Sequence, residues 1–102
     1  MSAPRRHPLA RADIEQSARW YEDQKPGLGD EFVDEVNRVV NLIAEHPSRY
    51  SIRFGQWRRA NLRRFPHAVF YRIIANQPIV FAVLHAKREH YGILEGRVPT
   101  SS

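Results

Sequence analysis

The feature of this sequence that most constrains its fold is a change of hydrophobic period near Pro47. The apolar residues of segment 28–45 follow the spacing of one helix face: Leu28, Phe32, Val36, Val39, Val40 and Ile43. From residue 67 onward the apolar residues instead alternate with a period of two, which is typical of strands. A chain that begins with helices and ends with strands is expected to pack the helices on one face of a sheet.

The first half of the chain predicts two helices. The first runs from Leu9 to Gln24, with Pro8 in its first turn, and Lys25-Pro26-Gly27 ends it. The second runs from about Leu28 to Glu45 and ends at His46-Pro47. Two amphipathic helices joined by a short loop are expected to form an antiparallel hairpin.

The second half predicts three strands. An arginine-rich strand is expected around Trp57–Arg64, followed by an alternating strand over residues 67–74 in which Val69 and Tyr71 share one face. Residues 75–78 form the turn, and residues 79–86 are apolar enough for a central strand buried on both faces. With a possible edge strand around Arg5–His7, the order is β-α-α-β-β-β. The expected class is α+β, with an N-terminal two-helix hairpin packed on one face of a small, mostly antiparallel sheet.

The composition bounds the class of protein. A length of 102 residues suits one domain over residues 1–102, of which 96–102 are expected to form a flexible tail. The absence of cysteine excludes disulfide bonds and thiolate metal sites. No apolar run reaches the roughly 20 residues that a membrane span needs, and the first residues lack the apolar core of a signal peptide. A cytoplasmic protein without a cofactor is therefore expected.

Positive charge is concentrated in the second half of the chain. Residues 1–50 hold 7 Lys and Arg against 9 Asp and Glu, whereas residues 51–102 hold 9 against 2. Fourteen of the sixteen basic residues are arginine, whose planar fork suits phosphate and carboxylate groups. Two interpretations stay open: a solvated basic face, or a surface for an anionic partner such as nucleic acid or an acidic protein segment.

Four segments form an ordered pattern over roughly residues 10–89. They read ARADIEQSARWYEDQKPGLGDEFVDEV, IAEHPSRY, RRANLRRFPHAVFYRI and IVFAVLHAKRE. This ordered set resembles the ParE branch of the RelE/ParE toxin superfamily, the toxin halves of bacterial toxin–antitoxin pairs, which include plasmid-stabilisation systems. The ordered set is much more specific than any one of its motifs.

The resemblance implies a compact toxin that a cognate antitoxin binds and neutralises. Antitoxins of this kind carry a DNA-binding part and an extended, partly acidic arm that wraps the toxin. The toxin alone is therefore not expected to bind specific DNA sequences. The ParE branch is associated with poisoning DNA gyrase, and the RelE branch with cutting mRNA on the ribosome. Shared fold does not decide between the two activities, so the site residues must.

RNA cleavage of the RelE type needs a base for the 2′-hydroxyl, an acid for the leaving oxygen and cations for the phosphate charge. By the resemblance, Ala68 stands at a strand position where those RNases usually have arginine. No Asp or Glu lies between Ser51 and Lys87, although one RNase sub-branch uses a Glu on its middle strands. A partial catalytic set remains for this alternative: Arg88, His90, Tyr91 and Arg63.

Two further residues have more than one interpretation. Trp57 stands among arginines, either exposed as an interface anchor or covering the edge of the sheet. His85 ends the last strand and could act as an acid or base, since histidine titrates near neutrality. No acidic or nucleophilic partner is close to it in sequence, which favours a hydrogen-bonded structural histidine. No two histidines have the spacing of a helical zinc site, so no metal is expected.

The leading hypothesis is a ParE-like toxin that binds and poisons DNA gyrase without catalysis of its own. One surface is expected to contact the target or the antitoxin: Trp57, Arg58, Arg59, Arg63, Arg64, Lys87 and Arg88. A ribosome-dependent mRNA endoribonuclease is the enzymatic alternative. An inactive paralogue that only binds the antitoxin is the third.

Overall fold

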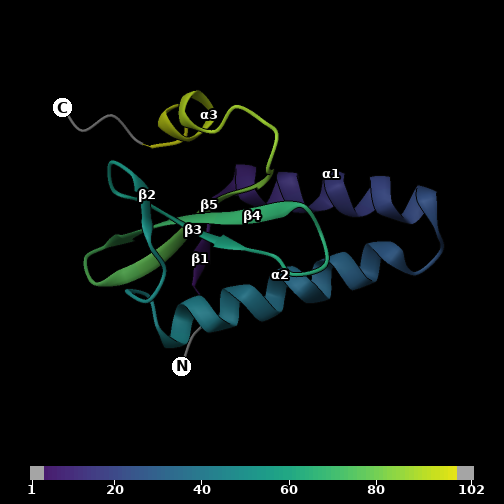
Figure 1. The fold of residues 1–102 in the computed structure, drawn as a ribbon, viewed down its shortest axis with the longest axis horizontal. Coiled ribbons are helices and arrows are strands. Elements are labelled where there is room, and N and C mark those ends of the chain that lie inside the picture. The colour runs from purple at the N-terminus through teal and green to yellow at the C-terminus, as the bar shows by residue number, and fades with distance from the viewer. Residues whose placement is uncertain (1–3, 99–102) are drawn as a thin grey trace.

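The fold places a five-stranded sheet between a helical hairpin and a short C-terminal helix (Figure 1). The computed structural model describes residues 4–98. Its helices are α1 (Pro8–Gln24), α2 (Leu28–Glu45) and α3 (Tyr91–Glu95). Its strands are β1 (Arg5–Arg6), β2 (Ile52–Phe54), β3 (Trp57–Asn61), β4 (His67–Ile74) and β5 (Gln77–His85). The predicted α+β class, with two helices on one face of a mostly antiparallel sheet, is confirmed.

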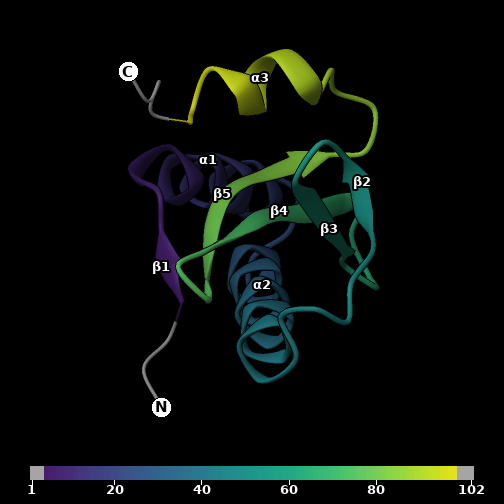
Figure 2. The same cartoon turned by 90° about the vertical axis from the view of Figure 1, so that its left-hand side faces the viewer.

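The strands lie in the order β1-β5-β4-β3-β2. β1 pairs in parallel with β5, and every other neighbouring pair is antiparallel. β1 and β2 therefore form the opposite edges of the sheet, as Figure 2 shows. β4 and β5 are joined through Ala75 and Asn76, whose φ values of 52° and 65° are those that a two-residue type I′ turn requires. The turn is thus shorter than predicted, and β5 begins at Gln77.

Three features differ from the sequence-based prediction. β2 and α3 were not expected, because neither short segment has a periodic apolar pattern. The arginine-rich strand was expected to reach Arg64, but β3 ends at Asn61. The chain turns there because the Leu62 amide donates to the His67 carbonyl at 2.9 Å. Arg63 and Arg64 consequently lie in the loop between β3 and β4.

One face of the sheet packs on α1 and α2. The predicted apolar stripe of α2 faces this core, and Phe32, Val36 and Val40 are completely buried. Val69 and Tyr71 of β4 point into the same core, as the alternation predicted. The Tyr71 hydroxyl donates to the carbonyl of Pro47, just beyond the end of α2, at 2.5 Å. No helix within residues 4–98 is long and apolar enough to cross a lipid bilayer.

The other face of the sheet is also apolar, and α3 covers it (Figure 2). This second core contains a set of side chains from β3, β4, β5 and α3: Trp57, Ala68, Phe70, Phe81, Ala82, Leu84 and Leu94. Phe70 pairs with Ala82 but Tyr71 pairs with Val80, so Phe81 is an extra residue in β5. This bulge lets consecutive residues of β5 face the second core. The prediction that this strand is buried on both faces is confirmed.

A buried ion pair joins α1 to the C-terminal segment. The Arg97 guanidinium donates to both carboxylate oxygens of Asp13, at 2.6 and 3.1 Å. Asp13 also accepts from the Val83 amide at 3.0 Å, and Arg97 donates to the Phe81 carbonyl at 3.0 Å. β1 pairs only with the first half of β5, so these contacts satisfy backbone groups on the part of β5 that β1 leaves unpaired. Residues 96–102 were expected to form a flexible tail, but Arg97 is held by these contacts. Residues 99–102 lie outside the described part of the chain.

A carboxylate of α2 holds the loop between β3 and β4. Glu35 accepts two hydrogen bonds from the Arg38 guanidinium, at 2.9 and 2.8 Å, and one from the Arg63 amide at 2.7 Å. The Arg38 guanidinium and then the Arg63 amide lower the pKa of Glu35 from 4.5 to about 2, against the opposing effect of burial. Glu35 therefore stays ionised and fixes the backbone at Arg63, in the loop that follows β3.

Candidate functional site

Four cationic residues lie in the two loops at one end of the sheet. β3 and β5 both run antiparallel to β4, so they end at the same end of the sheet. The loop after β3 and the turn after β5 are joined there by the Ala86 amide, which donates to the Pro66 carbonyl at 2.8 Å. We call this region the cationic end: Arg63, Arg64, Lys87 and Arg88.

The side chains of the cationic end are all exposed. Arg64 forms an ion pair with Glu31 at 2.6 Å, and its guanidinium lies over the Phe65 ring. Such a surface pair contributes only about 0–1 kcal/mol, so Arg64 can exchange Glu31 for another carboxylate at little cost. No ion pair in the described part of the chain involves Arg63, Lys87 or Arg88. Each of these four predicted residues is thus accessible to a partner.

Trp57 does not belong to this surface. Its side chain is 1 % exposed and lies in the second core, where its ring packs edge-on against Phe81. Its indole N–H donates to the Glu95 carboxylate at 3.1 Å, so α3 covers it. The interpretation of Trp57 as an exposed anchor is therefore wrong, and Trp57 does not cover an edge of the sheet either, because it belongs to the core between β3 and α3.

The arginines of β3 differ from those of the cationic end. Arg58 donates to the carbonyls of Ser48 and Tyr50, at 3.3 and 2.6 Å, and so supports the loop after α2. Arg59 is half-buried, and its Nε donates to the Asn61 side chain at 2.9 Å. Arg59 lines a different cavity from Arg88, so the structure does not bring all the predicted contact residues together.

The cavity beside Arg59 is a groove at the β2 edge of the sheet, with a volume of about 710 Å³. We call it the arginine groove, and its walls consist of β2, the loop before it and part of β3: Arg49, Tyr50, Ser51, Ile52, Arg53, Arg59 and Asn61. Sequence reasoning missed Arg49 and Arg53, because they lie in a stretch without periodicity. The local density of arginine was the only signal that could have indicated them.

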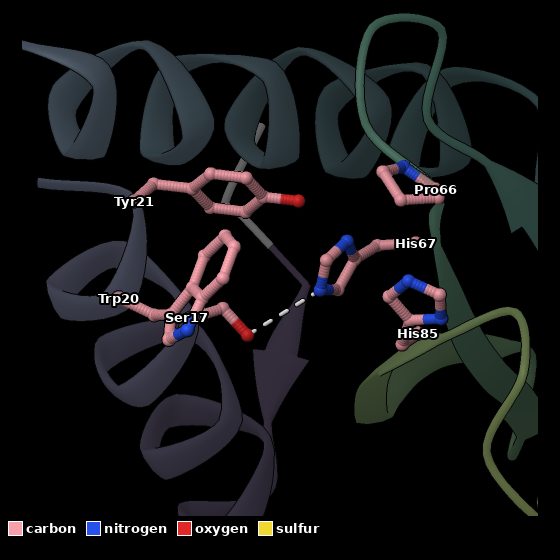
Figure 3. Close-up of a pocket in the computed structure, with 6 residues that line it drawn as sticks. All are labelled: Ser17, Trp20, Tyr21, Pro66, His67 and His85. Atoms are coloured by element: carbon pink, nitrogen blue, oxygen red, sulfur yellow. Dashed lines mark hydrogen bonds between the residues drawn. The ribbon is translucent and has the colours of Figure 1, made fainter. Parts of the chain in front are cut away.

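A second cavity, of about 380 Å³, lies between α1 and the start of β4 (Figure 3). We call it the histidine pocket, and six residues line it: Ser17, Trp20, Tyr21, Pro66, His67 and His85. Trp20 is 59 % exposed at its rim, whereas His67 is buried, and its Nε2 lies 3.5 Å from the Ser17 hydroxyl. Burial, with a smaller effect of His85, lowers the pKa of His67 to about 4, so this ring is neutral at physiological pH.

His85 has a structural partner in the turn that follows it. Its Nδ1 accepts a hydrogen bond from the Lys87 amide at 3.0 Å, and its ring lies edge-on to that of His67 with 5.2 Å between centroids. This contact fits the interpretation of His85 as a hydrogen-bonded histidine at the end of its strand. Within residues 4–98, no three His, Asp or Glu side chains come close enough to hold a metal ion.

The residues of the RNase alternative each have their own contacts in the structure. The Nε2 of His90 lies 2.9 Å from the His85 carbonyl, to which it can only donate, and its ring packs on Phe70. Tyr91 packs on Phe54 at the start of α3, and Arg88 lines a cavity with Trp20 and Asp13. His90 thus has one nitrogen committed to the backbone, while the contacts found for Tyr91 and Arg88 are with other parts of the chain.

The fold and its exposed arginines define a small, basic α+β protein with surfaces suited to binding anionic partners. The family model described as "ParE toxin of type II toxin-antitoxin system, parDE" matches residues 5–90. Because the match covers most of the chain, the protein belongs to this toxin family, and the resemblance inferred from the sequence is confirmed. A comparison with curated proteins finds no match. Membership of the family implies an antitoxin as partner.

Proposed function

We propose that this toxin binds DNA gyrase and traps the enzyme with cleaved DNA, without catalysing a reaction of its own. The observation that carries the proposal is the chemistry of the cationic end, which offers exposed guanidinium and ammonium groups. The nearby His90 has its Nε2 engaged by the His85 carbonyl at 2.9 Å. Exposed cations without a poised acid and base suit recognition of carboxylates better than bond cleavage.

The same surface gives a physical account of neutralisation. An acidic antitoxin arm that pairs with Arg63, Lys87 and Arg88 would cover the groups that the target needs. Opposite charges would also speed the encounter, because electrostatic steering raises association rates. Toxin and antitoxin would meet in the cytoplasm, where gyrase acts on the chromosome.

A supercoiling assay with purified gyrase tests the proposal. The wild-type toxin is expected to inhibit supercoiling and to increase the amount of cleaved DNA. The double variant Lys87→Glu/Arg88→Glu is expected to inhibit far more weakly, because two contact charges are reversed. Arg5→Glu/Arg11→Glu, in β1 and the start of α1, reverses two exposed charges near the beginning of β5 and serves as the matched control. Equal inhibition by the double variant and the control would exclude the cationic end as the contact surface.

Two outcomes would favour the other hypotheses. Site-specific cuts in translated mRNA that disappear in His90→Ala would establish the ribosome-dependent endoribonuclease. Normal growth of cells that express the toxin without its antitoxin would instead indicate an inactive paralogue. Growth arrest together with gyrase inhibition and intact mRNA is the result expected here.

A further inference from the structure

We infer that the arginine groove binds the phosphodiester backbone of DNA. This inference rests on the proposed function, in which the toxin meets gyrase together with the DNA that gyrase has cleaved. It assigns a partner to a second surface, because the groove lies at the β2 edge and Arg63, Lys87 and Arg88 do not line it. The toxin would then contact the protein with one surface and the DNA with the other.

The charges of the groove are not neutralised within the described part of the chain. None of the ion pairs found there involves Arg49, Arg53 or Arg59, and no carboxylate is among the residues that line the groove. Burial, and then the positive charge of Arg53, lower the pKa of Arg59. Like charges held close together raise the free energy of the unbound protein, and a bound anion would relieve that repulsion.

Arg59 is held in position before any ligand binds. Its Nε donates to Asn61 at 2.9 Å, and its guanidinium carbon lies 5.7 Å from the centroid of the Phe70 ring. Neither contact uses the two terminal nitrogens, which are the pair that binds phosphate oxygens in a fork. A guanidinium that is already oriented loses less conformational entropy on binding.

The groove fits a nucleic acid better than an acidic peptide. Its arginines alternate with apolar surface, since Ile52 is 53 % exposed and the Tyr50 ring is half-buried beside them. A nucleic acid strand presents phosphates together with flat bases, and binding surfaces for such strands combine cations with aromatic or apolar groups. The volume of about 710 Å³ also leaves room for a length of chain rather than for a single small ion.

Fluorescence anisotropy with a short fluorescein-labelled DNA oligonucleotide, without gyrase, tests the inference. The full-length protein is titrated into the labelled DNA at several salt concentrations. Three phosphate contacts predict a slope of roughly −2 to −3 in the plot of log affinity against log salt. Arg53→Gln and Arg59→Gln are each expected to weaken binding severalfold and to reduce the slope by about 1. Arg53 is exposed, so its variant tests the groove even if Arg59→Gln is less stable.

The matched control is Arg5→Gln, which removes one exposed arginine from β1 at the opposite edge of the sheet. This control is expected to bind DNA as the wild type does. A loss equal to that of Arg53→Gln would mean that binding follows overall charge and would overturn the inference. Absence of DNA binding by the wild type would overturn it as well. Either failure leaves the supercoiling result unaffected, so the two proposals are judged separately.

Competition identifies the class of ligand. An unlabelled RNA oligonucleotide of the same sequence that competes equally or more weakly than DNA supports a phosphodiester site suited to DNA. Tighter binding of RNA than of DNA would overturn the assignment to DNA. Displacement of DNA by a poly-glutamate peptide at comparable charge concentration would assign the groove to an acidic protein segment instead.

Discussion

The carboxylate of Glu35 allows a quantitative prediction about stability. Its partners hold its pKa at about 2 instead of 4.5, and this difference corresponds to about 3 kcal/mol at roughly 1.4 kcal/mol for each pKa unit. Arg38 is 37 % exposed, so solvent screening reduces the loss expected for Glu35→Gln to about 2 kcal/mol of unfolding free energy. The variant keeps the size of the side chain and removes only its charge and one strong acceptor.

The pH dependence of this loss follows from the direction of the pKa change. Since the native pKa lies below the unfolded one, the contribution is fully present above pH 4.5 and disappears as the pH falls through about 2. The two proteins should therefore differ most at neutral pH and converge in acid. Urea unfolding followed by the fluorescence of the buried Trp57 measures the difference at each pH.

Glu31→Gln provides the comparison within the same helix. Glu31 pairs with Arg64 on the surface, and the loss of such a pair costs at most about 1 kcal/mol. A difference between wild type and Glu35→Gln that stays constant from neutral pH to acid would refute the reasoning. It would mean that the side chain contributes through packing and not through its charge.

Three further predictions concern buried groups. Trp57→Phe removes the indole donor to Glu95 and should lower the unfolding free energy by about 1 kcal/mol and speed amide exchange in α3; unchanged exchange would contradict this role. Arg97→Met leaves the Asp13 carboxylate buried without its cation and should lower the unfolding free energy, measured with urea, by about 3 kcal/mol. A smaller decrease than that of Trp57→Phe would contradict a buried ion pair. NMR titration should show that the His67 ring stays neutral down to about pH 4. Because its native pKa lies below the unfolded value, the stability linked to the neutral ring is complete above pH 6.5 and is lost as the pH falls towards 4. Titration near pH 6.5 would contradict the burial of this ring.

Periodicity alone predicted most of the architecture. The apolar stripe of α2 predicted where the helix begins and ends and which of its faces is buried. It could do so because the stripe is defined by residues that are close together in the sequence. The alternation of β4 likewise separated Val69 and Tyr71 from Phe70 across the sheet. β2 and α3 were not predicted because such short elements are stabilised by tertiary contacts. Leu94 of α3, for example, is buried in a core whose other buried members come from β3, β4 and β5.

The candidate surfaces were predictable only in part. Arg63 and Lys87 could be grouped from sequence, because the ends of two strands that flank a third must meet at one end of the sheet. The burial of Trp57 could not, since α3 covers it from a distant part of the chain. The arginine groove was hidden for a similar reason: Arg49 and Arg59 come together only once β2 pairs with β3.

The pairing of β1 with β5 has a consequence for synthesis of the toxin. β1 leaves the ribosome first, yet its partner β5 ends at His85, and the ion pair of Asp13 needs Arg97 near the C-terminus. Domains fold as units once their parts are available. We therefore expect a nascent chain that is arrested before β5 to remain sensitive to protease, and a chain that includes Arg97 to resist it. The cell would then meet a folded toxin only after translation has passed Arg97.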